Sequence, residues 1–211
     1  MIIYHVESGA GKSTKAILLM IEAQKAYPDK LVAFIDCEQA FDKEYAEKLG
    51  LKTDEEFLFF IQPDSANQAL DLMLQFISSS LFSIVVLDSV PALVPEQNLN
   101  ADVGDVQVAS AARLLSNELR RIMIETKKSN TATVLINQWR ANIGFTGGDK
   151  AMPGGQAMKY YPSMTIDLKR KELVKKGDDF IGMDVQANFI KHRFGAPFTK
   201  AVYRLYYGEG I

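Results

Sequence analysis

The chain has 211 residues, of which 47% are hydrophobic and 24% charged, and its mean hydropathy is −0.05. This is the composition of an ordinary globular protein, so disordered and collagen-like chains are excluded. The formal net charge is −2, which gives no global attraction to nucleic acid or to an anionic membrane. Residues 159–211, however, carry 10 basic and 6 acidic residues, so a polyanion should favour this part of the chain.

The residues that form zinc sites and disulfides are scarce. Cys37 is the single cysteine and cannot form an intramolecular disulfide, while His5 and His192 lie far apart in the sequence. No apolar run approaches the roughly 20 residues needed to span a bilayer, and the N-terminus does not have the pattern of a secretory signal. We therefore expect a cytoplasmic protein without a membrane partner, folded as one domain over residues 1–211.

Strand-like and helical segments alternate through the first two thirds of the chain. Short apolar runs predict strands at 1–6, 31–36, 57–61, 83–88 and 131–137. Helical periodicity predicts helices at 12–26, from about Asp42 to Leu49, after the capping-box residues Ser65 and Gln68, and at about 106–128. This alternation favours a mostly parallel sheet connected by crossover helices.

The pattern changes after residue 138. Residues 139–156 contain five glycines and a proline without strand or helix periodicity, which predicts a long functional loop. The segments near 163–170, 183–193 and 200–207 are strand-like and have short connections. They predict an antiparallel extension of the sheet.

GAGKST at 9–14 lies between the first predicted strand and the first helix, where a phosphate-binding loop is expected. Backbone N–H groups at the helix start would hold phosphate oxygens, Lys12 would reach the outer phosphates, and the Ser13 hydroxyl would bind magnesium. The phosphate-loop pattern has glycine at the place of Val6, and valine does not easily adopt a positive φ. If Val6 strains the turn or crowds the β-phosphate, Val6→Gly should tighten nucleotide binding, whereas unchanged or weaker affinity would show that the loop follows another path. A glycine-rich turn that merely caps the helix is the alternative interpretation.

Two carboxylates follow buried strands and are candidates for chemistry at the same site. Asp88 ends the apolar strand IVVLD and would orient the ligands of a magnesium ion. Glu38 lies just beyond LVAFID and is the best candidate for a general base, because the carboxyl ends of parallel strands converge on the ligand crevice. An ordinary strand-end or solvated loop carboxylate is the alternative for each. Cys37, beside Glu38, is interpreted as a small buried apolar side chain.

The chain resembles the ATPase core of the bacterial RecA recombinase family in six sequence blocks that keep their order from Ile2 to Ile211. These blocks are FIDCEQAFDKEYAEKLGL at 34–51, LDSVPAL at 87–93, GDVQVASAARLLSNELRR at 104–121, SNTATVLINQWRANIG at 129–144, GGQAMKYY at 154–161 and IKHRFGAPF at 190–198. The resemblance implies a RecA-like P-loop NTPase of the α/β class. Its central sheet would be mostly parallel, flanked by helices, with an antiparallel C-terminal extension.

The resemblance also implies roles at a nucleotide site. Glu38 would activate the hydrolytic water, Tyr45 would lie against adenine, and Gln138 would sense the γ-phosphate and signal to the adjoining DNA loop. Lys191 and Arg193, which alternate on a predicted strand and so share one face, would complete the ATP site of a neighbouring subunit. The catalytic residues would be Glu38, Lys12 and Gln138, the metal ligands Ser13 and Asp88, and the nucleotide-binding residues Ser8, Gly9, Ala10, Gly11, Lys12, Ser13, Thr14, Asp42, Tyr45, Lys191 and Arg193.

By the same resemblance, the segment from Asp102 to Ala109 and the segment 139–156 would be DNA-binding loops. The expected DNA-binding residues are Val108, Arg113, Ser116, Arg120, Trp139, Arg140, Ile143, Gly154, Gly155 and Gln156. Backbone amides, arginines and apolar wedges such as Trp139, Ile143 and Phe145 can hold a single strand without regard to its sequence. A buried anchor is the alternative for Trp139, and a solvated helix face is the alternative for the two arginines of the helix.

The expected function is therefore that of an ATP- and Mg²⁺-dependent recombinase core, which binds single-stranded DNA and hydrolyses ATP when DNA is bound. Duplex DNA as a partner, self-association in a filament or ring, and the hydrolysis rate stay open. We expect the chain to lack the N-terminal helix and strand that link RecA subunits and the C-terminal domain that gathers duplex DNA. The alternatives are a nucleotide-gated DNA-binding accessory protein with weak or no ATPase activity, or a small-molecule P-loop kinase, for which Arg140 alone would serve as a lid arginine.

Overall fold

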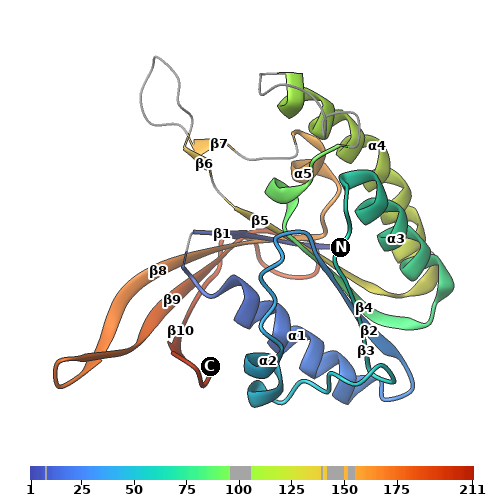
Figure 1. Ribbon diagram of the computed structural model, residues 1–211. Helices are drawn as coiled ribbons and strands as arrows, with labels where there is room; N and C mark the ends of the chain where they lie inside the picture. The colour runs from blue at the N-terminus through green and yellow to red at the C-terminus, as the bar shows by residue number, and fades with distance from the viewer. Residues whose placement is uncertain (8, 96–105, 139, 142–149, 152–154) are drawn as a thin grey trace.

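The computed structural model describes residues 1–7, 9–95, 106–138, 140–141, 150–151 and 155–211. Its centre is an eight-stranded sheet with the strand order β10-β9-β8-β1-β5-β4-β2-β3 (Figure 1). The strands are β1 Ile2–Val6, β2 Leu31–Asp36, β3 Leu58–Ile61, β4 Phe82–Asp88, β5 Ala132–Gln138, β8 Met164–Lys176, β9 Asp179–His192 and β10 Lys200–Tyr206. From β3 to β8 neighbouring strands are parallel, whereas β8, β9 and β10 are antiparallel. The predicted mostly parallel sheet with an antiparallel extension is confirmed.

Helices cover both faces of this sheet (Figure 1). One face carries α1 Lys12–Ala26 and α2 Lys43–Leu49. The other carries α3 Ala66–Ser79, α4 Val106–Ser129, the short α5 Ala157–Tyr160 and a 3₁₀ helix, η1, at Val90–Ala92. Among the helices in the described part of the chain, none is both long and apolar enough to cross a membrane.

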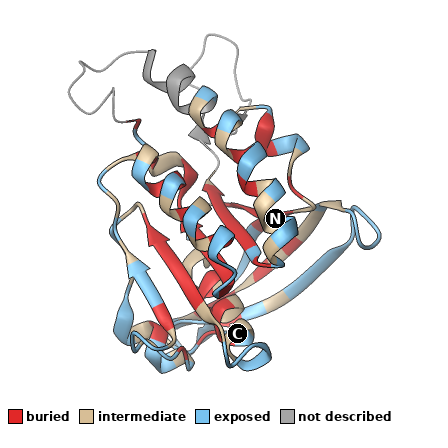
Figure 2. Ribbon diagram, turned by 90° about the vertical axis from the view of Figure 1, so that its right-hand side faces the viewer, coloured by how far each residue is buried: buried red, intermediate tan, exposed pale blue. Residues whose placement is uncertain are grey.

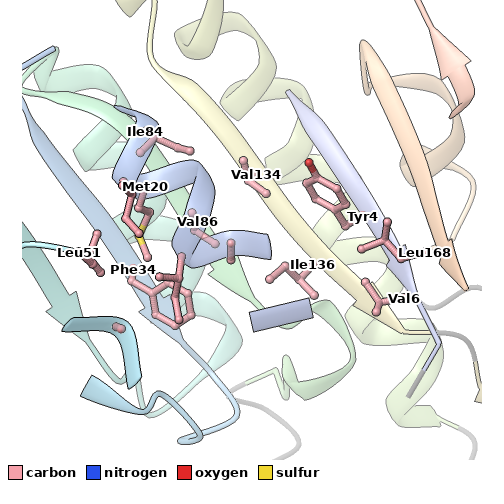
Figure 3. Close-up of a cluster of buried hydrophobic side chains, with 14 of the residues drawn as sticks. Tyr4, Val6, Met20, Phe34, Leu51, Ile84, Val86, Val134, Ile136 and Leu168 are labelled. Carbon is pink, nitrogen blue, oxygen red and sulfur yellow. The ribbon is translucent and has the colours of Figure 1, made fainter. Parts of the chain in front are cut away.

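The alternation of side chains along the strands builds one hydrophobic core on each face of the sheet. Tyr4 and Val6 of β1 point toward α1 and α2 and join Met20 and Phe34 in the first core (Figure 3). Ile3, the residue before Tyr4, points the other way into the core beneath α3 and α4. The buried residues follow the central strands, so the sheet is a rigid platform for the loops at its edge (Figure 2).

Two segments differ from the sequence-based expectation. Within 139–156, where no strand was expected, β6 Arg140–Ala141 pairs antiparallel with β7 Lys150–Ala151. A two-residue ladder is too short to leave a periodic pattern. The strands β8 and β9 extend well beyond their predicted bounds into a long hairpin, whose tip is largely exposed on both faces and therefore lacks the alternation that marks a half-buried strand.

The expectation of a strained turn at Val6 is wrong. Val6 is the last residue of β1, is 1% exposed, and pairs with Gln138 on one side and Leu168 on the other. It is not among the residues with positive φ, and its side chain packs in the first core. Valine is therefore suited to this position as a buried strand residue.

We expect Val6→Gly to lower the free energy of unfolding by about 3 kcal/mol, because it removes a buried side chain and adds backbone entropy to the unfolded chain. Urea unfolding of the two chains measures this loss. The matched control is Val202→Gly, on β10, whose side chain is 62% exposed and which should lose about 1 kcal/mol or less. Equal losses in the two variants would contradict the buried position.

His5 introduces a buried titratable group into the middle of the sheet. It is 1% exposed and lies in register between Asn137 of β5 and Asp167 of β8. Burial lowers the pKa of His5 from 6.5 to about 4, although the neighbouring Asp167 acts in the opposite direction. Between these two pH values the unfolded chain binds a proton at His5 that the folded chain does not bind, so stability falls as the pH falls from 6.5 toward 4.

Replacing His5 with glutamine should remove this contribution. We expect the parent chain to lose about 3 kcal/mol more unfolding free energy than His5→Gln between pH 7 and pH 4. Asp88, whose pKa is raised to about 6, binds its proton first in the folded state and changes stability in the opposite direction. Because both chains contain Asp88, the difference between their urea unfolding curves isolates His5, and identical pH dependences would contradict the prediction.

Candidate active site

A glycine-bounded loop joins β1 to α1. Gly9 and Gly11 both have positive φ, 73° and 77°, and Gly11 precedes the first helical residue, Lys12. A Cβ atom at Gly11 would lie 2.5 Å from Leu205 Cδ1, so glycine is required there both by conformation and by space. The loop lies where the sequence places it, at the carboxyl end of β1, and Ser8 within it is outside the described residues.

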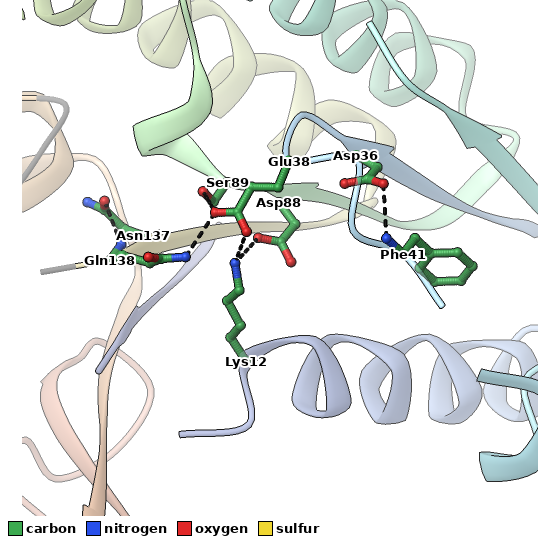
Figure 4. Close-up of polar contacts among 8 residues, drawn as sticks. All are labelled: Lys12, Asp36, Glu38, Phe41, Asp88, Ser89, Asn137 and Gln138. Carbon is green, nitrogen blue, oxygen red and sulfur yellow. Dashed lines mark hydrogen bonds and ion pairs between the residues drawn. The ribbon is translucent and has the colours of Figure 1, made fainter. Parts of the chain in front are cut away.

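Lys12 forms a charged cluster with two carboxylates at the carboxyl ends of neighbouring strands (Figure 4). Its ammonium group donates to Glu38 Oε2, which lies just beyond β2. It also donates to Asp88 Oδ1, at the end of β4, over a distance of 3.3 Å. The Asp88 side chain is 6% exposed, whereas those of Lys12 and Glu38 are 21% and 25% exposed. The parallel sheet thus brings together three residues that lie far apart in the sequence.

The second oxygen of Glu38 is also held. Glu38 Oε1 accepts a hydrogen bond from the Ser89 hydroxyl at 2.5 Å and another from Gln138 Nε2 at 2.9 Å (Figure 4). Gln138 ends β5, and its backbone N–H donates to Asn137 Oδ1 at 2.9 Å. Ser89 follows β4 directly, through a cis peptide bond from Asp88. Both carboxylate oxygens of Glu38 therefore have hydrogen-bond partners in this structure.

Asp36 orders the turn that carries Glu38. Its carboxylate is buried and accepts hydrogen bonds from the Phe41 backbone N–H and from Gln62 Nε2, both at 3.1 Å. The Cys37 backbone N–H donates to Asp88 O at 2.7 Å and so joins the ends of β2 and β4. These bonds restrain the backbone on either side of Glu38.

Burial controls the titration of the two groups beside Glu38. Burial raises the pKa of Asp88 to about 6, while Lys12 opposes this shift and Glu38 adds to it. Burial, reinforced by the nearby carboxylates of Asp36, Asp88 and Glu38, raises the pKa of Cys37 to about 12. The thiol therefore stays neutral, and Cys37 packs against the second core, in agreement with its interpretation as a small apolar side chain.

A cleft of about 370 Å³ opens beside the glycine-bounded loop. Its lining consists of Gly9, Gly11, Lys12, Ser13, Thr14, Tyr45, Met183, Leu205, Tyr207 and Gly208. Tyr45 extends from α2, and its hydroxyl hydrogen-bonds to the Thr14 hydroxyl at 2.9 Å. The loop, assigned to phosphate from its sequence pattern, and Tyr45, assigned to adenine from the family resemblance, thus line one cleft.

The C-terminal part of this cleft was missed by the sequence analysis. Met183 and Leu205 belong to β9 and β10, and Tyr207 and Gly208 follow β10. In the sequence, Met183 and Leu205 look like ordinary core residues of a strand. The pair Tyr207–Gly208 at the end of β10 was the available sign that this strand end could contribute to a binding cleft. Asp42, which was assigned to the nucleotide, caps α2 by accepting the Tyr45 backbone N–H at 2.9 Å, and it is not among the described residues that line the cleft.

The predicted cation pair lies apart from the Lys12 cluster. Lys191 Nζ donates to the carbonyl oxygens of Lys159 and Tyr160 at 3.0 and 2.9 Å, and Arg193 Nη2 donates to Tyr160 O at 3.2 Å. Both cations therefore point to the C-terminal end of α5. This common direction agrees with the same-face placement that the sequence predicts, although β9 ends at His192.

Some of the residues assigned to DNA are solvent-facing on α4 and near α5. Arg113 and Arg120 are exposed on α4, Ser116 is half-buried, and Gln156 is exposed just before α5. Gly155 has φ 70°. Gly154, Trp139, Ile143, Phe145 and the segment 102–105 lie outside the described residues, as do the side chains of Val108 and Arg140.

A mostly parallel sheet with a glycine-bounded loop and a lysine between its first strand and helix defines the P-loop class of nucleotide-binding folds. A sequence profile of the RecA N-terminal domain matches residues 1–211. The chain belongs to the RecA family. It is 40% identical to Protein RecA of Syntrophus aciditrophicus and 42% identical to Protein RecA of Porphyromonas gingivalis, each over 210 residues. These matches cover 99% of this chain and 60% of each relative, so the chain spans less than two thirds of their length.

Proposed function

We propose that residues 1–211 act as a RecA-type ATPase core, which binds ATP with Mg²⁺, binds single-stranded DNA and hydrolyses ATP in a DNA-dependent way during strand exchange. The observation that carries this proposal is the single network of Lys12, Glu38, Asp88 and Gln138 beside the glycine-bounded loop. It combines a cation for phosphate, a candidate base and a carboxylate for a metal. Family membership supports the same reading.

The residues present suit a magnesium ion that is bound together with the nucleotide. In the described part of the chain no group of three or more His, Cys, Asp or Glu side chains is arranged to hold a metal by itself. Magnesium commonly needs only one or two protein ligands plus substrate phosphates, and Ser13 with Asp88 fits this requirement. Among the described residues, the buried Asp88 carboxylate interacts with two other acidic groups, Glu38 and Asp36, and with one cation, Lys12, so added positive charge is favourable there. The ion would neutralise charge on the transferred phosphate.

Nucleotide binding requires the network around Glu38 to rearrange. Lys12 is paired with Glu38 and Asp88 here, and it would turn to the outer phosphates of ATP. Once Lys12 has moved, Glu38 Oε2 becomes available to accept a proton from water. Gln138, which now donates to Glu38, would then donate to the γ-phosphate. The same side chain thereby links the nucleotide to the segment that follows β5.

The exposed arginines of α4 belong to the described part of the proposed DNA surface. Arg113 and Arg120 face solvent, while Leu115 and Leu119 on the opposite side of the helix are buried. Helix α4 contacts α5, where Gly155 and Gln156 lie just before the first helical turn. Arginine and backbone contacts of this kind hold the sugar–phosphate chain without reading its sequence. We propose that Lys191 and Arg193 reach the ATP of a neighbouring copy, next to this surface.

ATP hydrolysis measured with and without single-stranded DNA tests the proposal. We expect turnover that rises when DNA is added and disappears in Lys12→Ala, which serves as the control for contaminating activity. ATP binding and ATP-dependent DNA binding without turnover would instead indicate a nucleotide-gated accessory protein. Hydrolysis that requires a small-molecule acceptor and ignores DNA would indicate a kinase.

A further inference from the structure

We propose that Ser89 is a positioning residue that fixes the Glu38 carboxylate for activation of water; this inference rests on the proposed function. Ser89 is 0% exposed, and its Oγ lies 2.5 Å from Glu38 Oε1. A fully buried hydroxyl that donates to a carboxylate forms one of the stronger neutral-to-charged hydrogen bonds in proteins. Its geometry sets the orientation of the whole carboxylate.

The Ser89 hydroxyl does not cap η1, although Ser89 stands at the N-cap position of that helix. Ser89 is the residue before η1, and serine at such a position normally accepts a hydrogen bond from the first turn of the helix. The Ser89 side chain forms no cap bond to η1 here, and the Ala92 backbone N–H donates to the Ser89 carbonyl oxygen at 3.1 Å. The hydroxyl is directed instead to Glu38, 51 positions earlier in the chain.

Ser89 differs from the other two groups that hold Glu38. Lys12 and Gln138 are the groups that turn to the phosphates in the proposed mechanism. Ser89 directly follows the buried strand β4, and the Cys37 N–H bond to Asp88 O joins that strand end to the turn carrying Glu38. Ser89 therefore keeps Glu38 Oε1 fixed while Oε2 is released from Lys12 and faces the water. Such orientation raises turnover without contributing to ATP binding.

Ser89→Ala tests this assignment in DNA-stimulated ATP hydrolysis. We expect kcat to fall roughly 10-fold while the KM for ATP stays unchanged, the loss that a hydrogen bond to a charged group produces. Ser83→Ala is the matched control, because Ser83 is a buried serine of β4, the strand that Ser89 follows, and its hydroxyl donates to Leu31 O at 3.1 Å. Its kcat should equal that of the parent. An equal fall in the two variants would overturn the proposal.

A double-variant cycle separates positioning from general loosening of the site. In a Glu38→Gln background, which retains no base, Ser89→Ala should cause no further fall in single-turnover rate. A general structural effect would instead lower the rate by the same factor in both backgrounds, and that result would reject the role of Ser89. If the parent chain hydrolyses no ATP, the proposed function fails; if the parent is active and the cycle is additive, only the Ser89 assignment fails.

Discussion

Glu38→Gln is expected to reduce ATP hydrolysis roughly 100-fold or more while ATP binding is retained. Glutamine preserves the size of the side chain and can still interact with Ser89, but it cannot take a proton from water. In the nucleotide-free chain, Glu38 also pairs with Lys12, the group proposed to bind phosphate. Removal of the negative charge releases Lys12, so ATP affinity should stay the same or rise.

Isothermal titration with ATP and a phosphate-release assay together check this prediction. The control is Glu22→Gln on α1, which removes an exposed carboxylate that pairs with Lys25 at the surface. Such a pair contributes little, so hydrolysis and binding should match the parent. If ATP affinity falls by the same factor as turnover in Glu38→Gln, Glu38 is a binding residue and not the base.

Gln138→Ala is expected to abolish most of the coupling between ATP and single-stranded DNA, with little effect on the basal affinity for either ligand. Gln138 ends β5 next to the glycine-rich segment, and it is hydrogen-bonded to Glu38 inside the active-site network. By linkage, ATP should strengthen DNA binding by the factor by which DNA strengthens ATP binding, with a typical coupling of about 1–3 kcal/mol. Alanine removes the amide that connects the two ligands.

Fluorescence titration of a labelled oligonucleotide, with and without a slowly hydrolysed ATP analogue, measures this coupling. The titration is repeated over a range of protein concentrations, so that a coupling that requires two copies to meet would be recognised by its dependence on concentration. Equal DNA affinity with and without nucleotide in the parent chain would contradict this coupling. Arg120→Ala should instead weaken basal DNA binding and reduce its salt dependence by about one unit of slope, as loss of a phosphate contact requires.

Arg121→Ala provides the matched control for Arg120→Ala. Arg121 carries the same charge on the same helix, but it pairs with Glu118 at 2.8 Å. It was not among the residues assigned to DNA. If the two variants weaken DNA binding equally, net charge and not a specific contact explains the effect.

The order and type of most elements could be predicted from the sequence, because burial repeats over a few residues. The strand LVAFID became β2 at Leu31–Asp36, and the helix predicted from Lys12 ends, as expected, at Ala26. Ser65 caps α3 by accepting the Gln68 backbone N–H at 3.2 Å, as predicted, whereas the Gln68 side chain accepts the Asp64 backbone N–H at 2.6 Å and not that of Ser65. The long hairpin was underestimated since its exposed tip has no alternation.

Within the candidate site, the sequence determined which chemical groups are available and roughly where they lie along the strands. Lys12, Glu38, Asp88 and Gln138 each stand at a strand end or helix start, and parallel strands bring such ends to one edge of the sheet. Their roles in ATP and DNA chemistry stay predictions. The sequence thus predicts that these side chains lie at the same edge of the sheet, but it does not predict which atoms contact one another there.

The tertiary structure alone decided which atoms meet. It placed Val6 in the core and not in the phosphate loop, brought Tyr207 and Gly208 into the cleft, and directed the Ser89 hydroxyl to Glu38. These contacts join segments separated by many residues, and they depend on strand order, register and close packing across the whole sheet. Local periodicity carries no information about such partners, because it reports only whether a residue is buried and not what it is buried against.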